Sequence, residues 1–233
     1  MATLYIVATP IGNLEDVTLR ALRVLKEVSV VFCEDTRTSR VLFSKYDIRT
    51  ATESFHAQSP LSKMDRVIEL LEAGKDIALV TDAGTPGISD PGMLLVSEVR
   101  SRLPDVPVVA VPGPSALTAA ISVAGRPLHE FVFLGFLPHK KGRQTLFEEI
   151  RTGERPYIFY ESPHRIEKAL ESLKGSGKNV TILRELTKMY ESYLSGTAEE
   201  ILLSFKNNPS TLRGEFVVIV SAEREAKPFS PEE

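Results

Sequence analysis

Residues 82–92 read DAGTPGISDPG and follow the apolar run of residues 77–80, where a buried strand is expected to end. The three Gly and two Pro in this segment can neither continue a strand nor begin a helix, so it predicts a shaped loop. Loops at the carboxyl ends of parallel strands line the ligand crevice of an open sheet, and glycine lets backbone groups approach a ligand closely. This segment is therefore a candidate binding loop.

Two further segments repeat the arrangement. Residues 4–8 run into a turn that reads TPIGN, and apolar residues then follow helical spacing. Residues 108–111 run into PGPSA at residues 112–116 and then into a small, apolar, helix-like segment. One such strand, turn and helix is common in any α/β protein as a tight connection. Three of them in one half of the chain favour a common crevice.

The periodicity predicts two α/β domains that join near Gly125. The first, residues 1–124, is expected to hold strands at residues 4–8, 28–33, 77–80 and 108–111, with a short one at 50–55. The second, residues 125–222, is expected to hold strands at 131–135, 157–160, 180–183 and 216–220, with helices at 143–151, 163–174 and 197–204. Residues 223–233 are expected to form a disordered tail.

Composition limits the class of protein. With 233 residues, 42% hydrophobic and 25% charged, the chain is typical of a soluble globular protein. No apolar run reaches the roughly 20 residues that span a bilayer, and no signal-peptide core precedes the first strand, so we expect no membrane association and a cytoplasmic location. The single Cys33 predicts a buried, inert thiol. Four His without zinc-site spacing predict no metal.

The turns also discriminate between cofactors. The sequence contains no G-x-x-x-x-G-K-[ST] loop, and the first turn has only Gly12 where a dinucleotide fingerprint needs G-x-G-x-x-G. ATP and NAD are therefore disfavoured. A ligand held by backbone groups and small side chains, without phosphates, fits better. S-adenosylmethionine is the cofactor that we expect.

Seven segments, in order over about residues 4–220, carry a resemblance to a known family. They are TPIGNL at 9–14, EDTRT at 34–38, the 82–92 loop, PGPSA at 112–116, GFLP at 135–138, FYESPHR at 159–165 and RELTK at 184–188. The chain resembles the ribosomal RNA small subunit methyltransferase I family of the tetrapyrrole methylase-like, class III S-adenosylmethionine-dependent superfamily. Many members carry His and Asn-Glu after the second helix, whereas residues 55–59 read FHAQS here.

The resemblance implies a fold, an activity and partners. The fold is two α/β domains of the tetrapyrrole methylase type with the cofactor cleft between them, usually in a homodimer. The activity is 2'-O-methylation of a cytidine ribose in the decoding region of 16S ribosomal RNA within the small ribosomal subunit. The residues implied to hold the cofactor are Pro10, Ile11, Asp82, Ala83, Gly84, Thr85, Ile88, Ser115, Ala116, Phe159, Tyr160, Gly214 and Glu215.

A ribose hydroxyl is a poor nucleophile at neutral pH, so methyl transfer needs in-line positioning and a group that accepts the proton or stabilises the charge. Asp35 follows a predicted strand at the crevice edge and Arg37 begins the next helix, although a helix-capping carboxylate and a surface ion pair explain them equally well. Glu185 and Lys188 lie three residues apart, and a lysine beside the hydroxyl stabilises developing alkoxide. The catalytic candidates are Lys188, Glu185 and Asp35.

Contacts with RNA are expected to be local, because the formal net charge of −3 does not indicate a broad basic surface. The turn at residues 139–143 reads HKKGR and contains no acidic residue. Basic side chains fix the RNA backbone while the target cytidine is splayed from its stack. The candidates are Arg37, Lys140, Lys141, Arg143, His164 and Arg165.

Two other functions remain open at this point. A small-molecule methyltransferase of the tetrapyrrole type would share the fold and the cofactor but would not need the basic turn. A non-catalytic S-adenosylmethionine-binding protein would keep the Gly/Pro loops and would not need Lys188 or Glu185.

Overall fold

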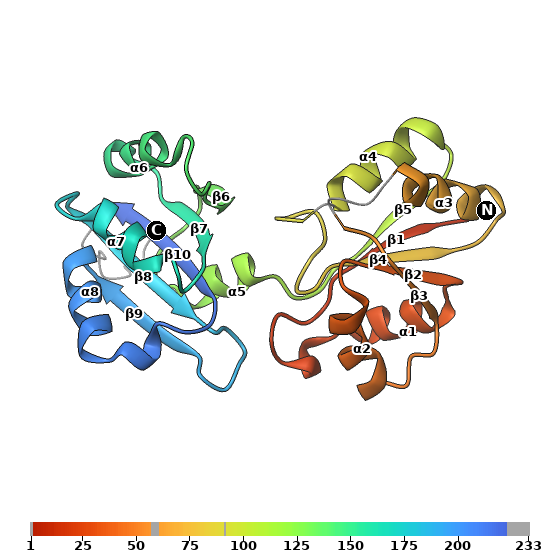
Figure 1. Cartoon of the computed structure of the whole chain (residues 1–233), viewed down its shortest axis with the longest axis horizontal. Coiled ribbons are helices and arrows are strands. Elements are labelled where there is room, and N and C mark those ends of the chain that lie inside the picture. The colour runs from red at the N-terminus through yellow and green to blue at the C-terminus, as the bar shows by residue number, and fades with distance from the viewer. Residues whose placement is uncertain (1, 57–60, 91, 223–233) are drawn as a thin grey trace, which may run out of the picture. The chain divides into compact units, whose positions relative to one another are not determined.

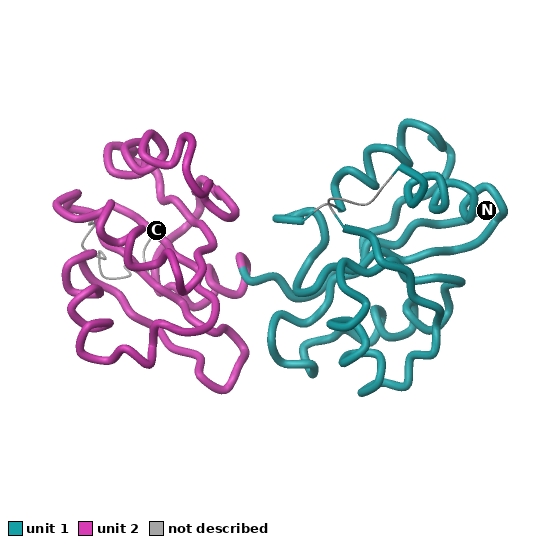
Figure 2. The backbone as a smooth tube through the Cα atoms, in the orientation of Figure 1, with its two compact units in different colours: residues 1–116 teal, residues 117–233 magenta. Residues whose placement is uncertain are grey.

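The computed structural model of the chain describes residues 2–56, 61–90 and 92–222. The chain divides into two compact units, Met1–Ala116 and Leu117–Glu233 (Figure 2). Each unit is built on its own five-stranded sheet. The predicted domain boundary near Gly125 lies just after helix α5 (Ala116–Val123), whereas the compact units divide at the start of that helix. The tail predicted at residues 223–233 lies outside the described residues.

The first unit contains an all-parallel sheet with the strand order β3-β2-β4-β1-β5. Its strands are β1 (Leu4–Val7), β2 (Val30–Cys33), β3 (Ala51–Ser54), β4 (Ile77–Val80) and β5 (Val108–Val111). All five predicted strands are confirmed. The second begins two residues later than predicted, because Val28 is still the C-cap of the preceding helix.

Helices cover both faces of this sheet (Figure 1). Helices α1 (Leu19–Glu27) and α2 (Thr36–Lys45) share one hydrophobic cluster with Val31 and Cys33. Helices α3 (Leu61–Glu72) and α4 (Gly92–Arg102) share another with Val30 and Phe32. Successive residues of β2 therefore enter opposite cores, which explains why its sequence is apolar throughout instead of alternating. A short 3-10 helix, Leu14–Asp16, follows β1.

The second unit contains a mixed sheet with the order β6-β7-β10-β8-β9. Among the described strands of this unit, only β6 (Val132–Phe136) and β7 (Tyr157–Glu161) pair in parallel. The antiparallel strands are β8 (Lys178–Arg184), β9 (Ser192–Gly196) and β10 (Phe216–Ala222). The four predicted strands are confirmed. Strand β9 was not predicted, although its intermediate and exposed residues alternate, because it contains only two large side chains, Tyr193 and Leu194.

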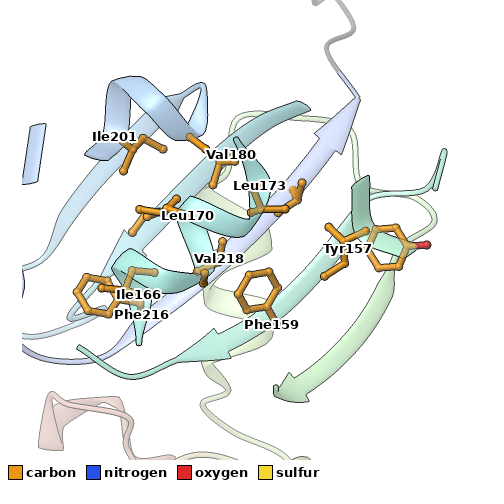
Figure 3. Close-up of a cluster of buried hydrophobic side chains, with 14 of the residues drawn as sticks. Tyr157, Phe159, Ile166, Leu170, Leu173, Val180, Ile201, Phe216 and Val218 are labelled. Carbon is orange, nitrogen blue, oxygen red and sulfur yellow. The ribbon is translucent and has the colours of Figure 1, made fainter. Parts of the chain in front are cut away.

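The hydrophobic core of this unit lies between the sheet and the helices α6 (Arg143–Thr152), α7 (Ile166–Leu173) and α8 (Ala198–Asn207). Figure 3 shows Phe159, Phe216 and Val218 from the sheet facing Ile166 and Leu170 of α7. Thr197 caps α8 in a reciprocal capping box with Glu200. The predicted helix at 163–174 begins only at Ile166. A short 3-10 helix, Pro209–Thr211, precedes β10, and no described helix is long and apolar enough to cross a membrane.

Candidate active site

Three loops meet at the carboxyl ends of the strands in the first unit. The backbone N–H of Thr9 donates to Gly84 O at 2.9 Å, and the N–H of Gly84 donates back to Thr9 O at 3.0 Å. The hydroxyl of Thr85 donates to Pro114 O at 3.0 Å. The order β4-β1-β5 makes these loops neighbours, since each follows one of three adjacent parallel strands. The structure therefore brings together the three Gly/Pro segments that the sequence singled out.

Glycine is required at one point of this junction. Gly84 has a φ of +83°, and a Cβ atom there would lie 3.3 Å from Ile11 Cγ2 and 3.6 Å from Pro114 O. Gly87 also has a positive φ, +91°, but a Cβ atom there would meet nothing within 4 Å. Gly84 thus lets the three loops pack together, and Gly87 lies on the open side of the loop.

The predicted cofactor residues of the first unit lie on these loops at different depths. Pro10, Ile11 and Ser115 are buried, so they shape the loops from beneath. Asp82 and Ala83 are exposed. Partly exposed positions are Thr85, Ile88 and Ala116. Sequence reasoning missed Thr9, which is 5% exposed and whose hydroxyl donates to Thr81 O at 3.2 Å.

Three carboxylates gather at the neighbouring ends of β2 and β4. The backbone N–H of Asp35 donates to Asp82 Oδ1 at 3.0 Å, and the N–H of Asp82 donates to Glu34 Oε2 at 3.4 Å. Partial burial, and next the charge of Glu34, raise the pKa of Asp82. The edge is therefore negatively charged, which suits a cationic ligand better than a phosphate.

Asp35 is occupied by its own helix. Its side chain caps α2 by accepting from the backbone N–H of Arg37 at 2.8 Å, and the Arg37 guanidinium approaches Asp35 Oδ2 to 2.6 Å. Hydrogen bonds from Arg37, first from the side chain and then from the backbone, lower the pKa of Asp35 to about 2. The helix cap and the surface ion pair, which explain Asp35 and Arg37 without a catalytic role, are therefore both present.

Two carboxylates surround Lys188 in the second unit. Its Nζ lies 3.0 Å from Glu185 Oε1 and 2.8 Å from Glu215 Oε2. The backbone N–H of Glu215 also donates to Glu185 Oε1 at 3.0 Å. Burial lowers the pKa of Lys188, but the hydrogen bonds to Glu215 and Glu185 outweigh it, so the net shift is upward. The ammonium form of Lys188 is therefore the form present at neutral pH.

The backbone around this cluster is strained. Glu185 and Thr187 have φ angles of +52° and +67°, which side-chain-bearing residues rarely adopt. Gly214 has a φ of +93°, and a Cβ atom there would collide with the side chain of Glu185. Such conformations persist only where surrounding contacts hold them, and they are concentrated at functional sites.

The two aromatic residues predicted to meet the adenine lie in different environments. Phe159 is fully buried in the core, edge-on to Phe147 at 6.3 Å between ring centroids (Figure 3). Tyr160 points to the other side of the sheet, edge-on to Phe133 at 5.2 Å and to Phe136 at 5.4 Å. Within this unit, the ring of Tyr160 is accessible to a ligand, whereas the ring of Phe159 is not.

The predicted RNA contacts divide into two groups. Arg143 and Arg165 lie 2.9 and 2.7 Å from the two oxygens of Glu161, whose side chain is 0% exposed. Their other guanidinium nitrogens donate to Pro138 O and Leu137 O, so both arginines hold the basic turn in place. Lys140, Lys141 and His164 remain exposed, and Arg37 is exposed but paired with Asp35. Glu161 ends β7 and Arg165 is the N-cap of α7, so the turn between the two elements brings these charges together.

Other chemistry on the described residues is limited. No group of three or more His, Cys, Asp or Glu among them could hold a metal ion. Cys33 is buried as predicted, and burial raises the pKa of its thiol to about 11. A polar hollow of about 320 Å³ lies along α2 and β3, and none of the predicted site residues lines it.

Comparisons with known proteins agree with this architecture. The family model described as Tetrapyrrole (Corrin/Porphyrin) Methylases matches residues 3–202. A protein of Hydrogenobaculum sp. called ribosomal RNA small subunit methyltransferase I is 41% identical over 94% of this chain and 96% of its own length. The protein of that name from Thermotoga maritima is 40% identical over 95% and 99%.

Solved structures show the same fold at low sequence identity. The methyltransferase CobJ superimposes with a TM-score of 0.70 at 18% identity, over 98% of each chain. Uroporphyrin-III C-methyl transferase from Thermus thermophilus, complexed with S-adenyl homocysteine, has a TM-score of 0.62 at 18% identity, over 94% of this chain and 97% of its own. The predicted fold, two α/β domains of the tetrapyrrole methylase type, is confirmed.

Proposed function

Because this chain belongs to the ribosomal RNA small subunit methyltransferase I family, within the tetrapyrrole methylases, we propose that it methylates a cytidine 2'-hydroxyl in the decoding region of 16S ribosomal RNA. S-adenosylmethionine is the methyl donor. The observation that carries the proposal is the high identity to proteins of that name over almost the whole of both chains.

The loop edge of the first unit has the chemistry to hold this cofactor. S-adenosylmethionine carries a sulfonium and an ammonium but no phosphate, and the edge presents the carboxylates of Glu34, Asp35 and Asp82. The loop of residues 82–90 borders this edge, and Gly87 lies on its open side. When bound, the cofactor supplies an electrophilic methyl group. Asp82, Ala83 and Thr85 would hold its methionine part.

Lys188 is the first candidate for activating the acceptor. Methyl transfer to the hydroxyl would form an oxygen–carbon bond and break a carbon–sulfur bond, so the hydroxyl proton would have to leave. A lysine held as ammonium cannot accept that proton, so its role would be to stabilise negative charge on the oxygen. Glu185 would then receive the proton, because its carboxylate lies beside the same ammonium, with Oε1 3.0 Å from Lys188 Nζ. Asp35 ranks third among the candidates. Its carboxylate is held ionised by Arg37 and is already occupied in capping the helix.

The RNA backbone would be held by Lys140, Lys141 and His164, which are exposed on and near the basic turn. Arg143 and Arg165 would contribute mainly by shaping that turn around Glu161. Arg37 would contribute its exposed guanidinium face. The proposal also includes a homodimer and a cytoplasmic location, where bacterial small subunits are assembled.

Methyl transfer from labelled S-adenosylmethionine tests the proposal directly. Purified protein would be given unmodified small ribosomal subunits, free 16S ribosomal RNA or a tetrapyrrole precursor. We expect label in the 16S ribosomal RNA, at a 2'-O-methylcytidine after nuclease digestion. Label only in the tetrapyrrole would favour the small-molecule methyltransferases that the solved structures represent. Cofactor binding without turnover on any acceptor would favour a non-catalytic binding protein.

A further inference from the structure

The loop that carries Lys188 also presents the most exposed apolar side chains of the second unit. Met189 is 89% exposed and Tyr190 is 68% exposed, directly after Lys188 in the chain. Large apolar side chains scattered singly on a surface are ordinary. Two consecutive ones, next to a strained lysine-bearing turn, need a separate explanation.

The loop that presents Tyr190 is held firmly. The Arg184 guanidinium donates to Tyr190 O at 3.0 Å and to Arg213 O at 2.7 Å, so it ties the loop to the segment before β10. The backbone N–H of Thr187 donates to Glu191 Oε2 at 2.6 Å, and the N–H of Glu191 donates to Lys188 O at 3.1 Å. These contacts fix the backbone on both sides of the ring. Binding a ligand on Tyr190 therefore requires little further ordering of this backbone.

We propose that the ring of Tyr190 is a stacking platform for an unpaired nucleobase of the RNA acceptor, next to the ribose that is methylated. The inference rests on the proposed function. Single-stranded RNA is recognised by splaying its bases onto aromatic side chains, because every base has a π-face. Two residues of chain span at most about 7 Å, so a base on Tyr190 keeps its nucleotide within reach of Lys188.

The surroundings of Tyr190 favour a base over another protein surface. Met189 and Glu191 flank Tyr190 in the chain, Lys188 lies two residues before it, and the Arg184 guanidinium donates to the carbonyl of Tyr190. The buried centre of a protein interface is depleted of charged residues. A small exposed surface of Tyr190 and Met189, bordered by Arg184 and Glu191, instead suits a nucleotide, whose base stacks while its phosphates and hydroxyls remain hydrated.

The absence of tryptophan from this chain makes a direct test possible. Tyr190→Trp keeps an aromatic platform and introduces the only indole, so its fluorescence reports on stacking. Tyr190→Ala removes the platform. Leu203→Ala is the matched control, because Leu203 is 58% exposed on α8 of the same unit. Binding to small ribosomal subunits, methyl transfer and thermal unfolding would be measured for all three variants and for the unaltered protein.

Tyr190→Ala should weaken binding to the small subunit by roughly 5- to 150-fold, the range for loss of one base stack. The melting temperature should not change, since the ring is exposed. Tyr190→Trp should keep activity, and its fluorescence should be quenched by small subunits but not by S-adenosylmethionine alone. Leu203→Ala should behave as the unaltered protein.

The inference is overturned if the unaltered protein methylates small subunits and Tyr190→Ala binds and turns over equally well. It is also overturned if Tyr190→Ala changes only the oligomeric state in light scattering, which would make the ring a contact between copies of the chain. Failure of the unaltered protein to methylate any RNA would instead refute the proposed function.

Discussion

The carboxylate of Glu215 lies 2.8 Å from the ammonium of Lys188, although the two residues are 27 positions apart in the sequence. Antiparallel pairing of β8 with β10 brings them together, with Phe216 opposite Arg184. The lysine is therefore anchored to the sheet as well as to its own turn. A charged group held in this way is preorganised for a charge that develops during reaction.

Replacement of Lys188 tests that role. Lys188→Ala should slow methyl transfer by roughly 100-fold or more, while RNA and cofactor binding change little, as expected for a group that acts mainly in the transition state. Single-turnover incorporation of labelled methyl groups measures the step. Lys206→Ala, on the exposed surface of α8, is the control. Full activity in Lys188→Ala would leave Glu185 and Asp35 as the candidates.

Gly214 should be essential for the geometry of the same cluster. Gly214→Ala combines the left-handed backbone penalty of about 1 to 2 kcal/mol with a collision against Glu185, so both stability and activity should fall. Gly177→Ala is a matched control, because Gly177 has a φ of +64° and open space where the Cβ atom would lie. Urea unfolding and methyl transfer would be compared. Equal activity losses in the two variants would contradict the steric explanation.

Glu161 should stabilise the fold more strongly than surface acids do. Glu161→Ala leaves Arg143 and Arg165 largely buried without their carboxylate, and losing one partner of a buried ion pair costs about 3 to 5 kcal/mol. Glu171→Ala, which removes a surface pair with Lys174, should change the free energy of unfolding by less than about 0.5 kcal/mol. Urea unfolding measures both. A small effect at Glu161 would mean that the two arginines find other partners.

Thr85→Trp tests the cofactor loop. The added ring should fill the space at the loop edge and abolish S-adenosylmethionine binding, while circular dichroism shows an intact fold. Thr85→Ser is the control, because it keeps a hydroxyl for the bond to Pro114 O. Calorimetric titration measures the affinities. An unchanged affinity in Thr85→Trp would place the cofactor elsewhere.

The exposed lysines of the basic turn should account for part of the salt dependence of RNA binding. Changing Lys140 and Lys141 together to Ala should weaken binding to small subunits and flatten the salt slope by up to about two units. Cofactor affinity should stay the same. The control is the double change of Lys26 and Lys75, which are exposed in the first unit. An unaltered slope would exclude the turn from the RNA site.

Local sequence patterns were sufficient to predict most of the secondary structure. Continuous apolar runs such as residues 77–80 are typical of strands buried on both faces, and Gly/Pro turns mark their carboxyl ends. Strand β9 was not predicted, because an edge strand with few large side chains depends on its pairing with β8 more than on its own composition.

Residue types alone determined much of the candidate site. The Gly/Pro loops, Asp82, and the pair of Glu185 and Lys188 stand out because their chemistry is local and their spacing is short. The tertiary structure decided which of the candidate side chains are accessible to a ligand or to RNA. Phe159 and Tyr160 are adjacent in the sequence, yet one faces the core and the other the opposite side of the sheet. Arg143 and Arg165 appear basic and accessible in the sequence, but in the fold both are largely buried and paired with Glu161. Burial and pairing depend on contacts between residues far apart in the chain, which local patterns do not encode.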